Sequence, residues 1–152
     1  MICLFSIAST DFEPADSRRV FPSMDEPAMK ARFQLTMIRH KNFTSTLFNA
    51  NLLETKPHPT EADWIIDQFD KSEVMSTYLV AFVVSNFKSI EMDSPKYGVK
   101  IGVAGRANAI DGGEGDEALI EAAQIIDFYS DYFGVKYPMP KSSKKIKRKK
   151  IR

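Results

Sequence analysis

Two carboxylates, Asp11 and Glu13, stand two residues apart near the start of the chain. On an extended backbone, side chains at this spacing point to the same face. Two neighbouring carboxylates repel each other unless a cation lies between them. An ammonium group at about 4 Å has a Coulomb energy of roughly 4 kcal/mol at an effective dielectric constant near 20, before desolvation. The pair is therefore suited to binding an amine. The alternative is a solvated acidic loop balanced by Arg18 and Arg19, and composition alone favours that alternative.

The sequence contains few residues of the types that commonly bind a zinc ion. The histidines are His40 and His58, and the one cysteine is Cys3. A helical zinc site uses two histidines four residues apart, which share a helix face, with a glutamate between them as base toward the zinc-bound water. Neither histidine has a second histidine four residues away. His40 falls at the end of a predicted strand, and His58 lies between two prolines. We therefore predict no metal site and interpret both histidines as surface residues.

The first two thirds of the sequence have the patterns of β-strands. In residues 32–41, apolar side chains such as Leu35 and Met37 alternate with polar ones, which predicts a half-buried strand. Residues 43–49 are a candidate partner for that strand. Two further segments have the apolar or alternating pattern of strands: residues 74–87 and residues 99–103.

The pattern changes after residue 111, where a glycine-rich loop precedes one long helix. Apolar residues recur at helical spacing over residues 116–133, Asp116 is a suitable N-cap, and Gly134 suits the position just after the helix. Strands followed by a helix indicate a β-rich domain and then the first part of an α+β domain. We place the boundary near residues 93–98.

Three blocks of the sequence resemble the M1 family of zinc aminopeptidases, in its aminopeptidase N-like branch. The first block, from Thr10, is TDFEPADSRRVFPSMDEPAMKARFQLTMI, which is similar to the family pattern T-Q-x-E/Q-P-x-x-A-R-R-x-F-P-C-F-D-E-P. The second, from Met75, is MSTYLVAF, and the third, from Gly115, is GDEALIEAAQIIDFYSDYFGVKYPMPK. The blocks occur in the family's order and cover most of residues 10–141.

The resemblance implies roles for residues of the first block. Glu13 takes the position whose side chain helps to bind the free α-amine of the substrate. Asp11 takes the position that lines the pocket for the first substrate side chain, where the family more often has glutamine. Asp25, Glu26 and Pro27 match a D-E-P turn, which we interpret as structural, with carboxylates tied to nearby backbone amides.

The catalytic motifs of the family do not occur in this sequence. Complete members carry H-E-x-x-H, and after Pro-Lys they continue toward G-A-M-E-N, whereas here the basic run KSSKKIKRKKIR appears. We therefore predict a truncated member with no catalytic residue and no cofactor of its own, zinc being the cofactor of complete members. We expect the chain to be inactive alone. The alternative is a non-catalytic module that binds peptides with a free N-terminus or pairs with a full-length relative.

The expected architecture is mainly β. Residues 1–95 are expected to form an incomplete antiparallel β-sheet or sandwich, the M1 N-terminal domain. Residues 96–140 are expected to begin the thermolysin-like catalytic domain with a strand and the helix 116–133. Residues 141–152 are expected to form a disordered basic tail.

Charge is distributed unevenly along the 152 residues. The net charge is +1, but the last twelve residues contain eight basic and no acidic side chains, so removing those eight charges leaves −7 on the rest. Such a tail is typical of nuclear signals and of nucleic-acid or anionic-lipid binding, but we expect no nucleic-acid partner here.

The sequence leaves the cellular compartment open. We expect neither a signal peptide nor a membrane span, because the apolar N-terminal run is short and no run approaches about 18 residues. The resemblance implies a cell-surface or extracellular location for complete relatives. Asn42-Phe43-Thr44 has the form of a glycosylation sequon, which matters only if the chain is secreted.

Overall fold

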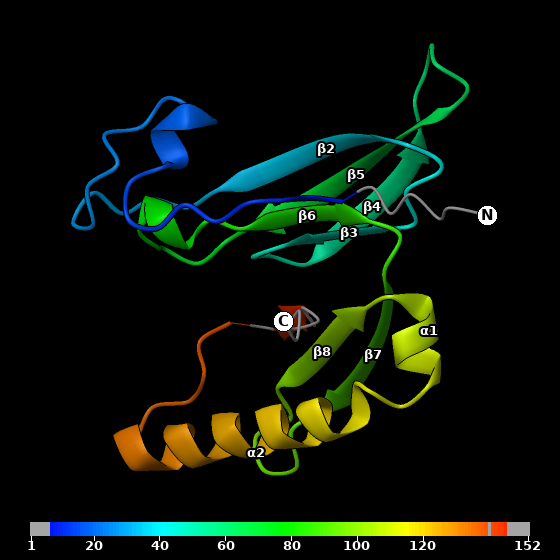
Figure 1. Cartoon of the computed structure of the whole chain (residues 1–152). Helices are drawn as coiled ribbons and strands as arrows, with labels where there is room; N and C mark the ends of the chain where they lie inside the picture. Colours follow the sequence, from blue (N-terminus) through cyan, green and yellow to red (C-terminus); the bar gives the residue numbers. More distant parts are fainter. Residues whose placement is uncertain (1–6, 140, 146–152) are drawn as a thin grey trace, which may run out of the picture. The chain divides into compact units, whose positions relative to one another are not determined.

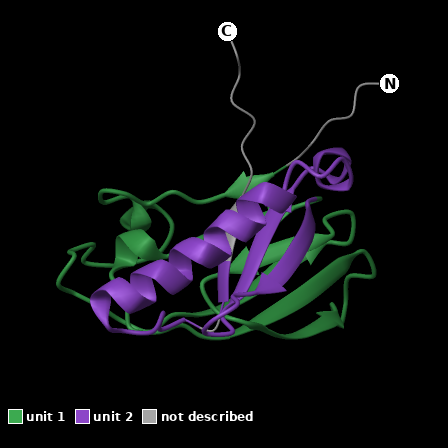
Figure 2. Ribbon diagram, turned by 90° about the horizontal axis from the view of Figure 1, so that it is seen from below, with its two compact units in different colours: residues 1–86 green, residues 87–152 purple. Residues whose placement is uncertain are grey.

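The computed structural model describes residues 7–139 and 141–145, which fall into two compact units (Figure 1, Figure 2). Met1–Asn86 form unit 1 and Phe87–Arg152 form unit 2. The sequence predicts a domain boundary after residue 95, whereas β7 (Lys88–Asp93) pairs along its length with β8 (Lys100–Gly105) in unit 2. The chain therefore changes unit before β7, and the limits of the two expected family domains stay a prediction.

Unit 1 contains two three-stranded antiparallel sheets, which confirms the predicted mainly β fold. One sheet has the strand order β1 (Ala8–Ser9), β6 (Phe82–Ser85), β3 (Ser45–Phe48). The other has the order β2 (Gln34–His40), β5 (Trp64–Lys71), β4 (Leu52–Pro57). The two sheets face each other (Figure 1), and the buried rings of Phe48 and Phe69, one from each sheet, meet edge to face with centroids 5.5 Å apart. Unit 1 is therefore a small sandwich.

Strand β2 shows how the sequence pattern produces the fold. Met37 is buried and Leu35 is half-buried, while Gln34 and Thr36 on the opposite face are exposed. Alternation of this kind places one face of a strand on the core and the other in water. The predicted half-buried strand is confirmed.

The predicted pairing of residues 43–49 with β2 is wrong. Strand β3 pairs with β6, where Ser45 lies opposite Ser85, and β2 pairs with β5. The turn after β2 carries the chain from one sheet to the other, so these consecutive strands lie in different layers of the sandwich. Alternation specifies which face of a strand is buried, but it does not specify the neighbouring strand.

Residues 74–87 form less strand than the sequence predicts. Within this segment only β6 is a strand, and Thr77–Leu79 form the 3₁₀-helix η2. The Ser76 hydroxyl donates to the Pro27 carbonyl oxygen at 2.6 Å, and the Thr77 hydroxyl donates to Asp25 Oδ1 at 2.7 Å. Side-chain hydrogen bonds of this kind offer the chain an alternative to a strand ladder.

Unit 2 combines a short sheet with two helices. Strand β8 lies between β7, which is antiparallel to it, and β9 (Lys141–Lys145), which is parallel. The helices α1 (Ala107–Asp111) and α2 (Asp116–Phe133) follow β8. The core is formed by buried apolar residues of β8, α1 and α2: Ile101, Val103, Ile110, Leu119 and Ala123.

Helix α2 begins and ends where the sequence predicts. Gly134 follows it with φ 65°, a left-handed conformation that glycine adopts without steric cost. The predicted cap differs by one residue, because Gly115 is the N-cap and Asp116 is the first helical residue. Asp116 therefore lies in the first turn, where a carboxylate interacts favourably with the helix dipole. The sequence pattern did not predict α1, whose five residues are too few to show helical periodicity.

The beginning of the expected basic tail is paired. In β9, Lys141 lies opposite Lys100 and Lys145 lies opposite Ala104. Backbone hydrogen bonding along a strand edge does not depend on side-chain type, so a segment rich in lysine and serine can occupy the edge of β8. The rest of the expected tail, residues 146–152, lies outside the described residues.

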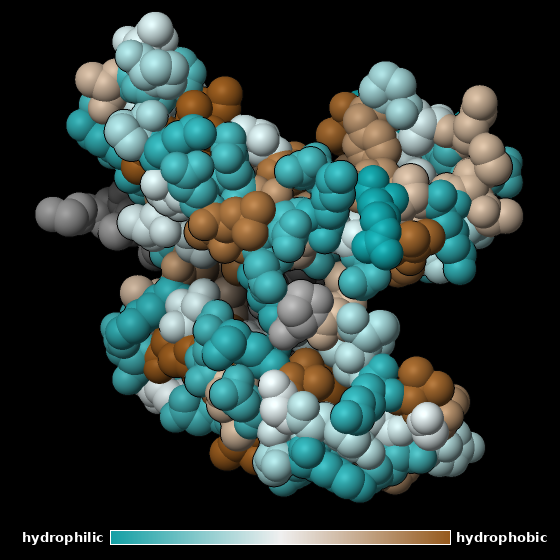
Figure 3. All heavy atoms as spheres, turned by 180° about the vertical axis from the view of Figure 1, so that it is seen from behind, coloured by the Kyte–Doolittle hydropathy of each residue, from teal (hydrophilic) through white to brown (hydrophobic). Residues whose placement is uncertain are grey.

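The surface combines polar cover with local apolar exposure. Hydrophilic side chains cover most of the face seen in Figure 3, with hydrophobic side chains between them. Exposed aromatic side chains also gather at the C-terminal end of α2, where Tyr132 is 71% exposed and Phe133 is 66% exposed. In the described parts of the chain, no helix combines the length and apolar character that crossing a bilayer requires.

Candidate functional site

The segment of residues 10–16, which we call the acidic segment, is attached to strand β6 through Thr10. The Thr10 backbone N–H donates to the Phe82 carbonyl oxygen at 3.2 Å, and the Phe82 N–H donates to Thr10 Oγ1 at 2.9 Å. Strand β1 just before it pairs with the same strand, with Ala8 opposite Val84. The start of the acidic segment is therefore fixed to the edge of a sheet.

Phe12 anchors the middle of the acidic segment. This residue is 4% exposed, and its ring packs edge to face on Phe21 and Phe82, with centroid distances of 6.0 and 6.3 Å. The Asp16 N–H donates to the Phe12 carbonyl oxygen at 2.9 Å and closes the turn that follows. An aromatic side chain buried in this way holds the backbone on either side of it in place.

Asp11 and Glu13 lie on either side of Phe12, and both are exposed. This exposed–buried–exposed order is the alternation expected of an extended segment. Among the described residues, neither carboxylate takes part in a hydrogen bond or an ion pair. The acidic segment therefore presents two carboxylates to solvent, free to accept hydrogen bonds from a cation.

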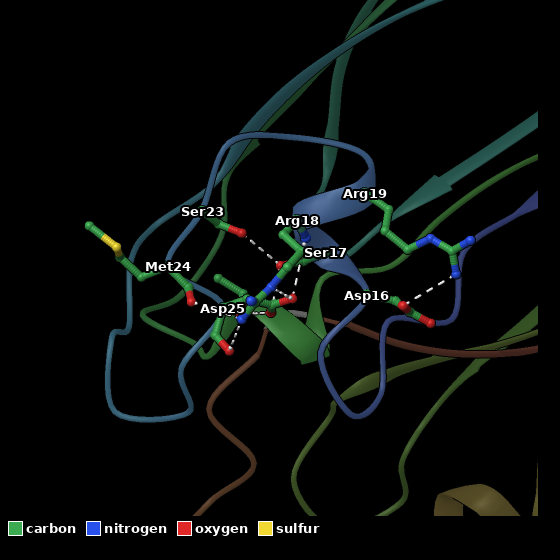
Figure 4. Close-up of polar contacts among 8 residues, drawn as sticks. Asp16, Ser17, Arg18, Arg19, Ser23, Met24 and Asp25 are labelled. Carbon is green, nitrogen blue, oxygen red and sulfur yellow. Dashed lines mark hydrogen bonds and ion pairs between the residues drawn. The ribbon is translucent and has the colours of Figure 1, made fainter.

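The two nearby arginines contact other groups. Arg18 Nε lies 3.4 Å from Asp25 Oδ2, and Arg18 Nη2 donates to the Met24 carbonyl oxygen at 3.1 Å (Figure 4). Arg19 Nη1 lies 3.4 Å from Asp16 Oδ1 on the surface (Figure 4). Arg18 and Arg19 therefore do not balance the charges of Asp11 and Glu13 through direct contacts.

Asp25 has the structural role expected of the D-E-P turn. Its buried carboxylate accepts hydrogen bonds from the hydroxyls of Ser17 and Thr77, both at 2.7 Å, and from the Arg18 backbone N–H at 3.3 Å (Figure 4). The hydrogen bonds from Ser17 and Thr77, with smaller contributions from Arg18, lower the pKa of Asp25 from 3.8 to about 2. Asp25 therefore ties the 3₁₀-helix η1 (Ser17–Arg19) to η2 as an anion and is occupied in doing so.

Each histidine accepts a hydrogen bond from a backbone N–H close to it in the sequence. His40 Nδ1 accepts from the Asn42 N–H at 3.2 Å, and its ring packs edge to face on Trp64. His58 Nδ1 accepts from the Glu61 N–H at 3.2 Å. Among the described residues, no three histidine, cysteine or acidic side chains are grouped so that they could hold a metal ion. Cys3 lies outside the described residues. Among the described residues, His40 and His58 do not have the H-E-x-x-H spacing of the zinc site that the resemblance implies for complete family members.

The sequence patterns missed a buried ion pair inside unit 1. Arg39 Nε of β2 lies 2.5 Å from Asp67 Oδ2 of β5. Asp67 also accepts hydrogen bonds from Thr46 Oγ1 of β3 at 2.8 Å and Thr55 Oγ1 of β4 at 2.7 Å. A signal was present in the sequence, because Asp67 stands two residues before Phe69 and therefore on the core face of the strand. Asp67 links the two sheets of unit 1 through its hydrogen bond with Thr46.

Comparisons with known proteins agree with the three sequence blocks. Residues 5–79 match the Peptidase M1 N-terminal domain. The chain is 42% identical over 136 residues to aminopeptidase N of Mus musculus and 39% identical over 139 residues to aminopeptidase N of Homo sapiens. It is 38% identical over 139 residues to aminopeptidase Ey of Gallus gallus.

Each of these alignments covers 90% of the chain but only 14% of the relative. The chain thus spans about a seventh of the length of the curated relatives it matches. The domain match includes the acidic segment and the D-E-P turn, which both belong to the first of the three sequence blocks. The chain belongs to the M1 peptidase family, and residues 5–79 carry the sequence of its N-terminal domain.

Proposed function

We propose that the acidic segment binds the α-ammonium group of a peptide with a free N-terminus, as the amine-recognition part of a zinc aminopeptidase. In this proposal Glu13 contacts the ammonium group, and Asp11 lines the pocket for the first side chain of the peptide. The observation that carries it is the pair of exposed carboxylates, without a protein partner among the described residues, on a backbone fixed by Phe12. The aminopeptidase relatives support the same assignment.

The expected affinity is low because the acidic segment is exposed. A carboxylate–ammonium contact at about 4 Å is worth about 1 kcal/mol in bulk water and roughly 4 kcal/mol near a protein surface. A single contact of this size, reduced by the loss of translational freedom on binding, corresponds to a Kd no tighter than about 1 mM. Contacts between exposed charges are screened by salt, so the affinity should fall as ionic strength rises.

Calorimetry with a matched pair of peptides tests this proposal. A short peptide without lysine is titrated into the full 152-residue chain, once with a free N-terminus and once acetylated. We expect heat only from the free amine, its loss in Glu13→Gln, and its partial loss in Asp11→Asn. Glu26→Gln is the control, because Glu26 is also an exposed carboxylate of the same family block. Equal heats from both peptides would contradict amine recognition, and equal behaviour of the Glu13 and Glu26 variants would contradict the role of Glu13.

We also propose that the 152-residue chain does not hydrolyse peptides by itself. Its only histidines, His40 and His58, do not have the H-E-x-x-H spacing. The test is release of a chromogenic amine from an aminoacyl substrate with zinc added. Turnover well above that of Glu13→Ala would show that the chain holds a catalytic site of its own.

A second candidate function is that of a non-catalytic module that pairs with a full-length relative. The observation that favours it is the exposed aromatic end of α2, where Phe128, Tyr132 and Phe133 contact one another. The chain matches only 14% of its relatives, so the occupant we propose for this surface is the part of a full-length relative that lies outside the match. Binding of immobilised chain to a purified full-length aminopeptidase should be lost in Tyr132→Ser with Phe133→Ser and kept in Ile120→Ser. Absence of binding by the unmodified chain would exclude this candidate.

A further inference from the structure

The turn between β2 and β3 contains a chemical motif that the proposed function does not use. Asn42, Phe43 and Thr44 form the only Asn-x-Ser/Thr triplet in the 152 residues, and its middle residue is not proline. This triplet is the acceptor motif for an Asn-linked oligosaccharide. Because short motifs arise by chance, an acceptor asparagine must also be exposed in the fold and not used in its hydrogen bonds.

Backbone and side-chain hydrogen bonds define the turn that carries the motif. The Phe43 N–H donates to the His40 carbonyl oxygen at 3.0 Å, which closes a four-residue turn. The Asn42 N–H donates to His40 Nδ1 at 3.2 Å, and the Lys41 N–H donates to the Asp63 carbonyl oxygen at 2.8 Å. Asn42 therefore lies in a well-ordered turn between two strands that belong to different sheets.

The side chains of the motif alternate between solvent and protein. Asn42 and Thr44 are exposed, whereas Phe43 between them is half-buried. The Phe43 carbonyl oxygen accepts a hydrogen bond from Arg39 Nη1, so the buried ion pair also fixes the middle of the motif. The amide of the acceptor and the hydroxyl that must accompany it thus both point away from the core.

Asn42 differs from two other asparagines of unit 1. Asn49 donates from Nδ2 to the Leu79 carbonyl oxygen at 3.0 Å and accepts from the Ala81 N–H at 2.6 Å. Asn86 Oδ1 accepts from the Thr44 N–H at 3.1 Å. Among the described residues, the Asn42 side chain takes part in no hydrogen bond. Its amide serves no structural purpose in the described fold and is available for reaction.

We propose that Asn42 is an acceptor for an Asn-linked oligosaccharide when the chain enters the secretory compartment. The donor is a lipid-pyrophosphate-linked oligosaccharide. A bond forms between Asn42 Nδ2 and C1 of the first sugar while the bond from C1 to the pyrophosphate oxygen breaks. Nδ2 gives up one proton, and the lipid pyrophosphate leaves with the electron pair of the broken bond. No group is oxidised or reduced. The attached glycan lies in solvent at the turn and displaces no protein contact.

The first experiment translates the full chain behind a cleavable secretory leader in the presence of endoplasmic-reticulum microsomes. In the protease-protected fraction we expect one discrete increase in apparent mass, removed by an Asn-glycan-releasing glycosidase. The increase should be lost in Asn42→Gln and Thr44→Ala and kept in Thr44→Ser. Asn42→Gln combined with Leu53→Thr is the positive control, because it creates an acceptor at Asn51, next to an exposed position. An unshifted protected chain beside a shifted control overturns the proposal.

A second measurement tests the structural part of the argument. Because the Asn42 side chain faces solvent, the glycosylated chain and Asn42→Gln should unfold at the same urea concentration, followed by the fluorescence of the single tryptophan, Trp64. A markedly lower midpoint for the glycosylated chain would show that Asn42 contacts the fold, and this result overturns the placement on which the proposal depends.

Discussion

Removing the carboxylate of Asp67 would leave the guanidinium of Arg39 inside the sandwich without a counter-charge. The Asp67 side chain is 0% exposed and that of Arg39 is 10% exposed. Removing one partner of a buried ion pair costs about 3–5 kcal/mol, because the other charge stays desolvated and unpaired. We expect Asp67→Ala to lower the free energy of unfolding of unit 1 by that amount. Since whole domains are stable by roughly 5–15 kcal/mol, this is a large share.

Urea unfolding followed by Trp64 fluorescence measures this loss. Trp64 is the only tryptophan, and it begins the same strand as Asp67, so its signal reports on unit 1. For an m-value of about 2 kcal/mol/M, the midpoint should fall by roughly 2 M. Asp63→Ala is the matched control, because it removes an exposed ion pair with Lys41 and should barely move the midpoint.

A double substitution separates the unpaired charge from the lost packing. Arg39→Met with Asp67→Leu replaces both charges with apolar groups and should recover most of the stability that Asp67→Ala loses. The reasoning is refuted if Asp67→Ala lowers the midpoint no more than Asp63→Ala. It is also refuted if the double variant is as unstable as Asp67→Ala.

The same ion pair predicts a dependence on pH. Burial raises the pKa of Asp67, but the hydrogen bonds from Arg39, Thr55 and Thr46 lower it by more, so the folded-state pKa lies below the ordinary value of 3.8. A carboxyl group whose pKa is lower in the folded state stabilises the fold above its unfolded-state pKa and loses this effect as pH falls. The difference in midpoint between the unmodified chain and Asp67→Ala should therefore shrink as pH falls below about 4.

Three further substitutions have expected outcomes. Because the pKa of Asp25 is about 2, its stabilising effect should be lost as pH falls from about 4 toward 2. The urea midpoint of Asp25→Asn should therefore fall less over this pH range than that of the unmodified chain, and an equal fall contradicts this. Gly115→Ala would place a Cβ 2.9 Å from Ile90 Cδ1 and 3.0 Å from Ile110 Cδ1. This overpacking should lower the free energy of unfolding by about 1–3 kcal/mol, measured by thermal melts that follow the helix content. Gly134→Ala meets no atom within 4 Å, so it should cost only about 1–2 kcal/mol from its left-handed backbone, and Gly134→Asn should cost less.

The parts of the fold that depend on neighbouring residues could be predicted from the sequence. Alternation around Leu35 and Met37 predicts β2, and helical spacing with a following glycine predicts α2 at both ends. In these elements the residues that decide the structure lie within a few positions of each other.

The parts that depend on distant residues could not be predicted in the same way. The pairing of β3 with β6 instead of β2 depends on how two sheets stack, which no local pattern contains. Likewise η2 replaces a strand because Thr77 donates to Asp25, a residue 52 positions away. The local pattern of residues 74–87 predicts a strand, and the partner that overrides it is visible only in three dimensions.

The candidate site was predictable in part. The spacing of Asp11 and Glu13 around an apolar residue predicts that both face the same way, and the structure exposes both. The sequence did not predict that Arg18 is held by Asp25, because Arg18 is closer in the sequence to Glu13 than to Asp25. Amine binding itself stays a prediction until peptides are tested.

The attachment of Thr10 to Phe82 also sets the order of events during synthesis of the chain. The two residues are 72 positions apart. At a translation rate of about 5–20 residues per second, roughly 4–14 s pass between their appearance at the ribosome. The acidic segment of the nascent chain therefore cannot bind to β6 until β6 has been synthesised. A substitution that disrupts β6 should leave the acidic segment unfolded even when its own residues are unchanged.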